Sequence, residues 1–282
     1  MIIDFHVHTF PDSIAPKTIR MLSMRSHTLP NTDGTIAGLR SSMEEAGIDI
    51  AVDLPVITNP ASTRKINDSY IRMNEEFDGK GVLAFGGIHP DTENPREEIL
   101  RLHRAGMKGI KIHPDYQDTF FDDIRYLRIM DAAAEMDMII LTHAGTDIGL
   151  PDPVHCTPKH VLHVLEQIQP GRLVLAHMGG WQMADEVEKY LCQAPVYFDT
   201  AYSLGSAFPP PEDESVRGEI CLMEEEKFLR IVKKHGADKI LFATDSPWAG
   251  QKNCREIFER LPLPLEEKTQ ILGENGRKLL GL

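Results

Sequence analysis

Histidine and aspartate residues stand at the ends of several short apolar runs in this sequence. His6 and His8 form an H-x-H pair in IDFHVH, and His143, His177 and Asp245 each end a later run. The H-x-H pair alone carries little weight, because 12 histidines among 282 residues would give about 0.5 such pairs by chance. The repetition of the same residue types at four separate run ends is what indicates a functional site.

Imidazole and carboxylate groups brought together in this way are suited to hold a divalent metal ion. Three neutral imidazoles and one carboxylate form a ligand set for Zn²⁺ or a similar ion, with one coordination position open for water. Binding lowers the pKa of that water from about 15.7 to about 7. This shift lowers the free energy of forming hydroxide by on the order of 12 kcal/mol. The fourth imidazole, with an ordinary pKa of about 6.5, is suited to move a proton.

Eight runs of mostly aliphatic residues must position these groups, and each is followed by a polar break and a longer amphipathic stretch. Strands that are buried on both faces of a parallel sheet have this near-continuous aliphatic composition. The runs cover residues 2–8, 48–56, 81–90, 107–114, 138–145, 172–180, 196–202 and 239–247.

Two of the intervening stretches carry clear helix signals. In the stretch that begins at Asp122, apolar residues recur at helical spacing and predict one buried face, made of Ile124, Leu127, Met130 and Ala134. In the other, Thr157 is suited to be the N-cap and Pro158 the first helical residue, and Gly171 follows the end.

Alternating strands and helices predict right-handed βαβ units and a parallel sheet. Eight of each favour an α/β fold of the (β/α)₈ TIM-barrel type over an open sheet, and the G-x-G-x-x-G signal of many open sheets is absent after the first strand. No linker or composition shift divides the chain, so residues 1–282 are interpreted as a single domain. Two long connections, from Thr9 to about Gly34 and from Ser203 to about Gly218, are expected on the C-terminal face, where barrel active sites lie.

The alternation of side chains along a strand predicts which groups face the barrel interior. In the first strand, Asp4, His6 and His8 are expected to face inward. The apolar residues between them, Ile3, Phe5 and Val7, are expected to face the helices. The same alternation places His143, His177 and Asp245 on the strand faces that also hold four aliphatic residues, Leu141, Leu175, Leu241 and Ala243. Lys111 and His113 are expected to point inward from the fourth strand.

Composition excludes several classes of function. A net charge of −13 repels phosphate backbones, so a nucleic-acid partner is not expected. Four scattered cysteines predict neither a disulfide framework nor a cysteine-rich zinc site. The N-terminus lacks the features of a signal peptide, and no apolar stretch is long enough to cross a bilayer. We therefore expect a cytoplasmic protein that acts on a small molecule, and the sequence leaves a homodimer open.

Several motifs together resemble the amidohydrolase superfamily, in the branch that includes aminocarboxymuconate-semialdehyde decarboxylase. They are IDFHVH, KGIKIHPDYQ, THAG, AHMGG, TDSPW and the closing GENGRKLLGL. The resemblance implies that His6, His8, His143 and Asp245 bind one divalent metal ion, with Zn²⁺ expected first and Mn, Fe, Co or Ni as alternatives. It implies that His177 is the catalytic acid or base, and that Asp245 serves in some relatives as the base for water.

Departures from other branches narrow the activity. Thr146 follows H-A-G where purine deaminases of the superfamily carry a glutamate, so that chemistry is not expected. The metal-binding glutamate of TatD-type nucleases is also missing from the strand that holds Lys111. Lys111 is either carboxylated, as in binuclear relatives, or an ammonium that offsets Asp4 or contacts a substrate carboxylate.

Other residues are expected to line the substrate pocket. His89 and His113 each end a strand in I-H-P-D, and Trp248 follows Asp245-Ser246-Pro247. Simpler structural roles remain open for all three, namely stopping a strand for the histidines and capping the barrel for Trp248.

Three functions follow from this pattern. The first is a metal-dependent hydrolase of a small-molecule amide, ester or lactone. The alternative is a metal-dependent non-oxidative decarboxylase of an aromatic or muconate-type acid, in which Lys111, Arg20 or Arg25 could hold the carboxylate. The third, a binding protein without turnover, is disfavoured because every catalytic position is filled.

Overall fold

The computed structural model describes all 282 residues and contains the eight predicted strands. One of them is interrupted at Phe85, so that its first part pairs with the preceding strand and its second part with the following one. The strands are β1 (Ile3–Val7), β2 (Ile50–Asp53), β3 (Val82–Ala84) continued by β4 (Gly86–Gly87), β5 (Gly109–Ile112), β6 (Ile139–Thr142), β7 (Leu173–Leu175), β8 (Tyr197–Asp199) and β11 (Ile240–Leu241).

All neighbouring barrel strands are parallel, in the orders β1-β2-β3 and β4-β5-β6-β7-β8-β11. Backbone hydrogen bonds join the first strand to the last. The Phe5 amide donates to the Phe242 carbonyl (2.9 Å), and the Asp245 amide donates to the His6 carbonyl (2.8 Å). These bonds close the barrel, and the predicted (β/α)₈ fold is confirmed.

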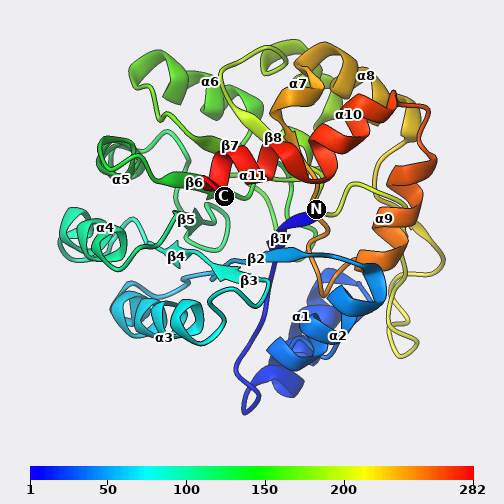
Figure 1. The fold of residues 1–282 in the computed structure, drawn as a ribbon, viewed down its shortest axis with the longest axis horizontal. Coiled ribbons are helices and arrows are strands. Elements are labelled where there is room, and N and C mark those ends of the chain that lie inside the picture. Colours follow the sequence, from blue (N-terminus) through cyan, green and yellow to red (C-terminus); the bar gives the residue numbers. More distant parts are fainter.

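Helices surround the strands, as Figure 1 shows. The outer helices are α2 (Ile36–Ala46), α3 (Thr63–Glu76), α4 (Pro95–Arg104), α5 (Ile124–Glu135), α6 (Pro158–Gln167), α7 (Ala184–Tyr190), α8 (Glu225–His235) and α9 (Gln251–Arg260). Thr157 caps α6 by accepting from the His160 amide, as predicted. In α5, Leu127 and Met130 are buried as predicted and Ala134 is partly buried, whereas Ile124 is 56% exposed and Tyr126 and Ile129 are buried in addition. None of the helices combines the length and the apolar composition that a membrane span requires.

The two long connections have structure of their own. The first contains α1 (Ala15–Ser26), and the second leads into a small antiparallel hairpin of β9 (Ser206–Ala207) and β10 (Ile220–Cys221). Two short helices end the chain, α10 (Leu265–Thr269) and α11 (Asn275–Leu280). In Figure 1, α11 crosses in front of the strands near both termini.

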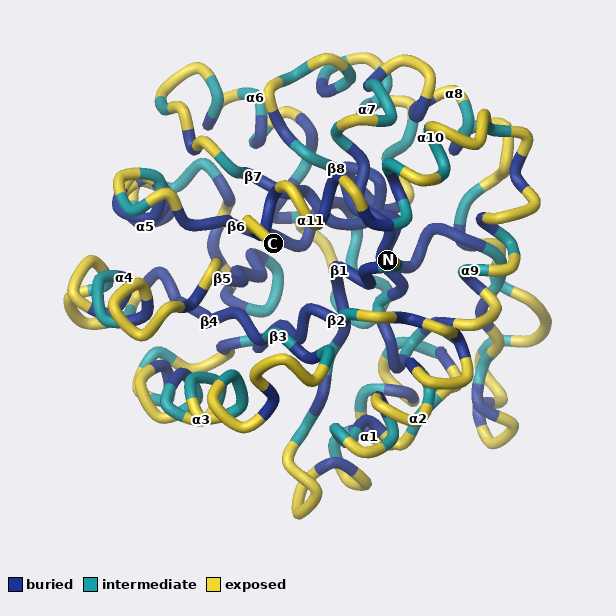
Figure 2. Tube along the Cα trace, in the orientation of Figure 1, coloured by how far each residue is buried: buried dark blue, intermediate teal, exposed yellow.

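Buried residues form two layers, which Figure 2 shows as a dark centre surrounded by helices with exposed outer faces. The larger cluster lies between strands and helices. The smaller one lies in the barrel interior and is built from residues in or next to every barrel strand except β5, and Leu279 and Leu280 of α11 join it. Both layers remove aliphatic surface from water, which is the main stabilising contribution in such a fold.

The alternation predicted for the first strand is wrong at its beginning. Ile3 and Phe5 belong to the interior cluster, whereas Asp4 bonds to Thr244 and to Gln251 at the start of α9. An irregular register between Asp4 and Val7 then returns His6 to the interior, because a bulge reverses the facing of the residues that follow it.

The grouping of His177 with Leu175 is also wrong. Leu175 faces the helices, and Val174 and Ala176 face the interior. His177 turns inward because its backbone is left-handed, with φ of 58°.

Candidate active site

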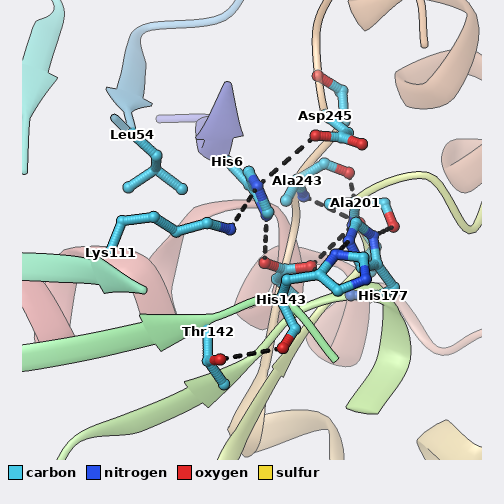
Figure 3. A network of polar contacts seen from close by, with 12 residues as sticks. His6, Leu54, Lys111, Thr142, His143, His177, Ala201, Ala243 and Asp245 are labelled. Atoms are coloured by element: carbon cyan, nitrogen blue, oxygen red, sulfur yellow. Dashed lines mark hydrogen bonds and ion pairs between the residues drawn. The ribbon is translucent and has the colours of Figure 1, made fainter. Parts of the chain in front are cut away.

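Three of the predicted ligands converge where β1 meets the segment after β11. The Nε2 atoms of His6 and His8 are 3.1 Å apart, and an Asp245 carboxylate oxygen lies 3.6 Å from the first and 3.3 Å from the second. Figure 3 shows Asp245 and His6 directed towards each other. We refer to His6, His8 and Asp245 as the seam cluster, because they lie at the ends of the two strands, β1 and β11, that close the barrel.

The hydrogen bonds of the other ring nitrogens fix the protonation of both imidazoles. His8 Nδ1 lies 2.7 Å from the Leu54 carbonyl and His6 Nδ1 lies 2.9 Å from an Asp199 carboxylate oxygen. Both partners accept, so each Nδ1 carries the proton and each Nε2 carries a lone pair. Burial also lowers the pKa of His6 well below its usual range, which keeps this ring neutral. Two lone pairs and a carboxylate that face one another fit a divalent cation.

A buried lysine approaches the same point. Lys111 Nζ lies 3.1 Å from His6 Nε2, and the side chain is only 1% exposed. Burial lowers the pKa of this ammonium, whereas the carboxylates of Asp199 and Asp245 raise it. Lys111 therefore brings a titratable nitrogen to the seam cluster, on the inward face that the sequence predicts for it.

His143 and His177 form a second pair beside the seam cluster. His177 Nε2 lies 3.0 Å from His143 Nδ1, and His177 Nδ1 lies 2.8 Å from the Ala201 carbonyl. Burial lowers the pKa of His177 to about 4, although Asp245 and the Ala201 carbonyl raise it. The unbound ring is therefore a neutral imidazole near pH 7.

The fourth predicted ligand, His143, gathers with a different set of groups. Its ligand atom lies within 4.8 Å of those of His113 and Asp147, which we call the outer cluster. The His113 and His143 rings stack at 4.3 Å, and His113 Nε2 lies 3.4 Å from Asp147. The Tyr116 amide donates to His113 Nδ1 (3.4 Å), so His113 Nε2 carries a proton that faces the Asp147 carboxylate.

Close backbone approach positions His143 and His177. Gly145 forms a bridge with Trp181, and a Cβ at Gly145 would lie 2.2 Å from the Trp181 amide nitrogen. Only glycine fits there, and its φ of +83° also favours glycine. The G in THAG and the adjoining AHMGGW segment therefore hold the two strand ends together.

A cavity of about 620 Å³ opens above these groups. Its walls are mainly apolar and aromatic, and α1 contributes several of them. Arg25 of α1 donates to the Gly149 carbonyl (2.7 Å) and lies over the Tyr116 ring at 5.5 Å. The lining includes eight of the predicted site residues, namely His6, His8, Lys111, His113, His143, His177, Asp245 and Trp248. His89 does not line this cavity. Its ring accepts from the Asp91 amide.

Sequence reasoning missed some of the residues that complete the site. Asp199 is fully buried, bonds to His6 and accepts from the His177 and Ala201 amides. It ends the apolar strand VYFD, so the signal that identified Asp245 was present here too. Asp147 and Tyr116 line the cavity from loops, where no strand pattern in the sequence predicts a site residue.

Comparison with solved structures shows the fold. The 5-carboxyvanillate decarboxylase of Sphingomonas paucimobilis is 13% identical, with a TM-score of 0.69, over 100% of this chain and 99% of that chain. A dihydroxybenzoic acid decarboxylase of Polaromonas sp. JS666, solved with bound manganese and the inhibitor 2-nitroresorcinol, is 15% identical, with a TM-score of 0.69, over 100% and 97%. An uncharacterized TIM-barrel protein of Bordetella bronchiseptica is 17% identical, with a TM-score of 0.77, over 99% and 98%.

Sequence comparison gives the family. No curated protein matches the chain. The family model described as amidohydrolase matches residues 3–282, in agreement with the resemblance drawn from the motifs. Since the match covers nearly the whole sequence, this chain belongs to the amidohydrolase family and is an enzyme.

Proposed function

We propose that this enzyme is a metal-dependent non-oxidative decarboxylase of an aromatic or muconate-type acid. The observation that carries the proposal is an apolar, aromatic-lined cavity that ends on the seam cluster and on Lys111. From the sequence, hydrolysis of an amide, ester or lactone is the first expectation, because a metal-bound water beside His177 and Asp245 would be sufficient for it. The solved structures support decarboxylation better, because several relatives of the same fold are decarboxylases of aromatic acids.

One divalent ion would be held by His6, His8 and Asp245, with His143 as the fourth expected ligand. The two converging imidazole lone pairs and the carboxylate provide a donor set that suits zinc or manganese. When bound, the ion would polarise the oxygens of the substrate. A single domain is proposed to carry the whole site.

The chain's own cations would orient an acidic substrate. Lys111 reaches the seam cluster from inside the barrel, and Arg25 lies at the wall formed by α1. A substrate carboxylate held by these two cations would gain charge-assisted hydrogen bonds. The aromatic walls, including Tyr116, Trp181 and Trp248, suit a planar ring.

His177 would deliver the proton. In the reaction, the bond between the substrate carbon and its carboxylate breaks, the electron pair stays on that carbon, and CO₂ leaves. His177 Nε2, which carries a lone pair in the neutral ring, would take up a proton from solvent in the substrate complex and transfer that proton to the carbon. The pKa of His177 is about 4 in the unbound site, and an anionic substrate raises it because opposite charge favours imidazolium.

Two parallel substrate panels test the proposal. Hydroxybenzoates and muconate-type acids are incubated with the metal-loaded enzyme while CO₂ is detected, and lactones, esters and amides are assayed for hydrolysis. CO₂ release that needs both metal and His177 is expected. Hydrolysis in the second panel with no CO₂ from the first would overturn the proposal and restore the hydrolase.

A further inference from the structure

Two buried polar atoms near His143 have no hydrogen-bond partner. They are His143 Nε2 and an Asp115 carboxylate oxygen, Oδ2, and they face each other at 4.0 Å. The two side chains are only 8% and 4% exposed. Buried polar groups are normally paired, so an unpaired couple this close requires a physical explanation.

The hydrogen-bond chain through His177 explains why the two atoms do not bond. His177 Nδ1 donates to the Ala201 carbonyl, so His177 Nε2 is an acceptor. His143 Nδ1, at 3.0 Å, must then carry the proton of the neutral His143 ring. His143 Nε2 is left with a lone pair that faces the Asp115 carboxylate, and two acceptors cannot bond to each other.

The arrangement becomes complementary if a cation takes His143 Nδ1. A bound metal ion displaces the proton from the coordinating nitrogen of a neutral imidazole, so the proton resides on the other nitrogen. His143 Nε2–H would then point at Asp115 Oδ2, and donor would face acceptor. Both unpaired atoms are satisfied by the same event.

Asp115 is held in place for this contact by a different loop. The His155 amide donates to Asp115 Oδ1 (3.0 Å), and His155 Nδ1 lies 3.1 Å from the same oxygen. Both bonds engage one carboxylate oxygen, which leaves Oδ2 directed at His143. The outer nitrogen of His155 approaches the exposed Asp118 at 3.3 Å.

The other imidazoles of the site are supported in the same way. His6 is held through Nδ1 by Asp199, His8 by the Leu54 carbonyl and His177 by the Ala201 carbonyl. Asp115 is the acceptor that the fourth ring, His143, otherwise lacks. Such partners fix the orientation and raise the basicity of metal-binding imidazoles.

The geometry points to Asp115 as a positioning residue, held by His155, that orients His143 to bind the metal ion through Nδ1. This inference rests on the proposed metal site and assigns to it Asp115, which lies in the KGIKIHPDYQ motif but receives no role from the sequence. It also specifies which nitrogen of His143 serves as the ligand.

Metal affinity provides the test. Metal-free wild-type protein and Asp115→Asn are titrated with Zn²⁺ against a chelating dye, and Co²⁺ absorption spectra report the ligand geometry. Asp115→Asn is expected to weaken affinity about 10- to 100-fold and to change the Co²⁺ spectrum. Asp118→Asn, on the same loop but exposed, is the matched control and is expected to change affinity less than about twofold.

A double-mutant cycle separates positioning from a general effect on folding. In a His143→Ala background, Asp115→Asn should cause no further loss of affinity, because its effect passes through His143. His155→Leu should give a smaller loss than Asp115→Asn, since the backbone amide of residue 155 still holds Oδ1. Unchanged affinity in Asp115→Asn, or an additive loss in the double variant, would overturn the inference alone. A wild-type chain that binds no metal would overturn the proposed function as well.

Discussion

Two clusters in this barrel have the same composition, two histidines and one aspartate, and opposite hydrogen-bond arrangements. In the seam cluster, His6 and His8 direct lone pairs towards Asp245, and their protons are held on the far side by Asp199 and the Leu54 carbonyl. In the outer cluster, His113 directs a proton towards Asp147. The three groups of the seam cluster face one another as acceptors and are approached by the Lys111 ammonium, whereas the outer cluster already pairs a donor with an acceptor among its own residues.

This difference shows that residue types alone do not define a metal site. The acceptor on the far side of each imidazole decides whether a lone pair or a proton faces the centre. We therefore expect the seam cluster to bind a cation, with His143 as the fourth ligand, and His113 and Asp147 of the outer cluster to form a hydrogen-bonded wall of the cavity.

Removing the seam histidines should have the largest effect. His6→Ala combined with His8→Ala is expected to reduce metal content from about one ion per chain to nearly none, and activity at least about 10³-fold. Elemental analysis of the purified proteins measures this. Equal metal content in variant and wild type would contradict the assignment, and two ions per chain would favour carboxylated Lys111.

Removing the proton donor should have the next largest effect. His177→Asn should retain the metal and lose about 10²- to 10⁴-fold in rate, or roughly 3–5 kcal/mol of transition-state stabilisation. Parallel measurement of metal content and turnover distinguishes the roles. Loss of metal together with rate would assign His177 to the ligand set.

In the outer cluster, removing charge should stabilise the metal-free protein. Burial raises the pKa of Asp147 from 3.8 to about 6, so the ionised form costs free energy in the folded state. The cost is absent below pH 4, grows as pH rises to 6 and is complete above it. Asp147→Asn should therefore raise the free energy of unfolding at pH 7.5 by up to about 3 kcal/mol, with no gain at pH 3.5. Thermal unfolding at both pH values checks this, and equal gains at both would contradict it.

The smallest effect is expected for His113 of the outer cluster. His113→Gln should change metal affinity less than about threefold, because its proton, not a lone pair, faces the cluster. Competition with a chelating dye measures the affinity. A loss similar to that of a single His6→Ala variant would show that the two clusters do not differ in function.

Most of the fold was predictable, because buried parallel strands leave long aliphatic runs in the sequence. All eight runs became barrel strands, and the cap at Thr157 formed as its residue type predicts. The facing of side chains was less predictable. The irregular register after Asp4 and the left-handed backbone at His177 are set by neighbouring strands and loops. The simple alternation of side chains along a strand predicts neither of them.

The candidate site was predictable only where strand ends supplied it. His6, His8 and Asp245 converge because the first and last strands are neighbours in a closed barrel. That His143 lies instead with His113 and Asp147 depends on positions around the barrel, which spacing along the chain does not reveal. Asp115 and His155 lie on separate loops, and only their folded contact indicates that they belong together.

The pairing of the first strand with the last has a consequence for the order of folding during synthesis. The first strand leaves the ribosome long before the last, and Asp4 and Thr244, which are 240 positions apart, share a hydrogen bond of 3.0 Å. The seam cluster can therefore assemble only after the final strand has been made and docked. An ion that binds only the closed barrel at 100 times its dissociation constant would stabilise it by about 2.7 kcal/mol. Metal supply during synthesis would then set how much of the nascent protein completes its last folding step and escapes proteolysis.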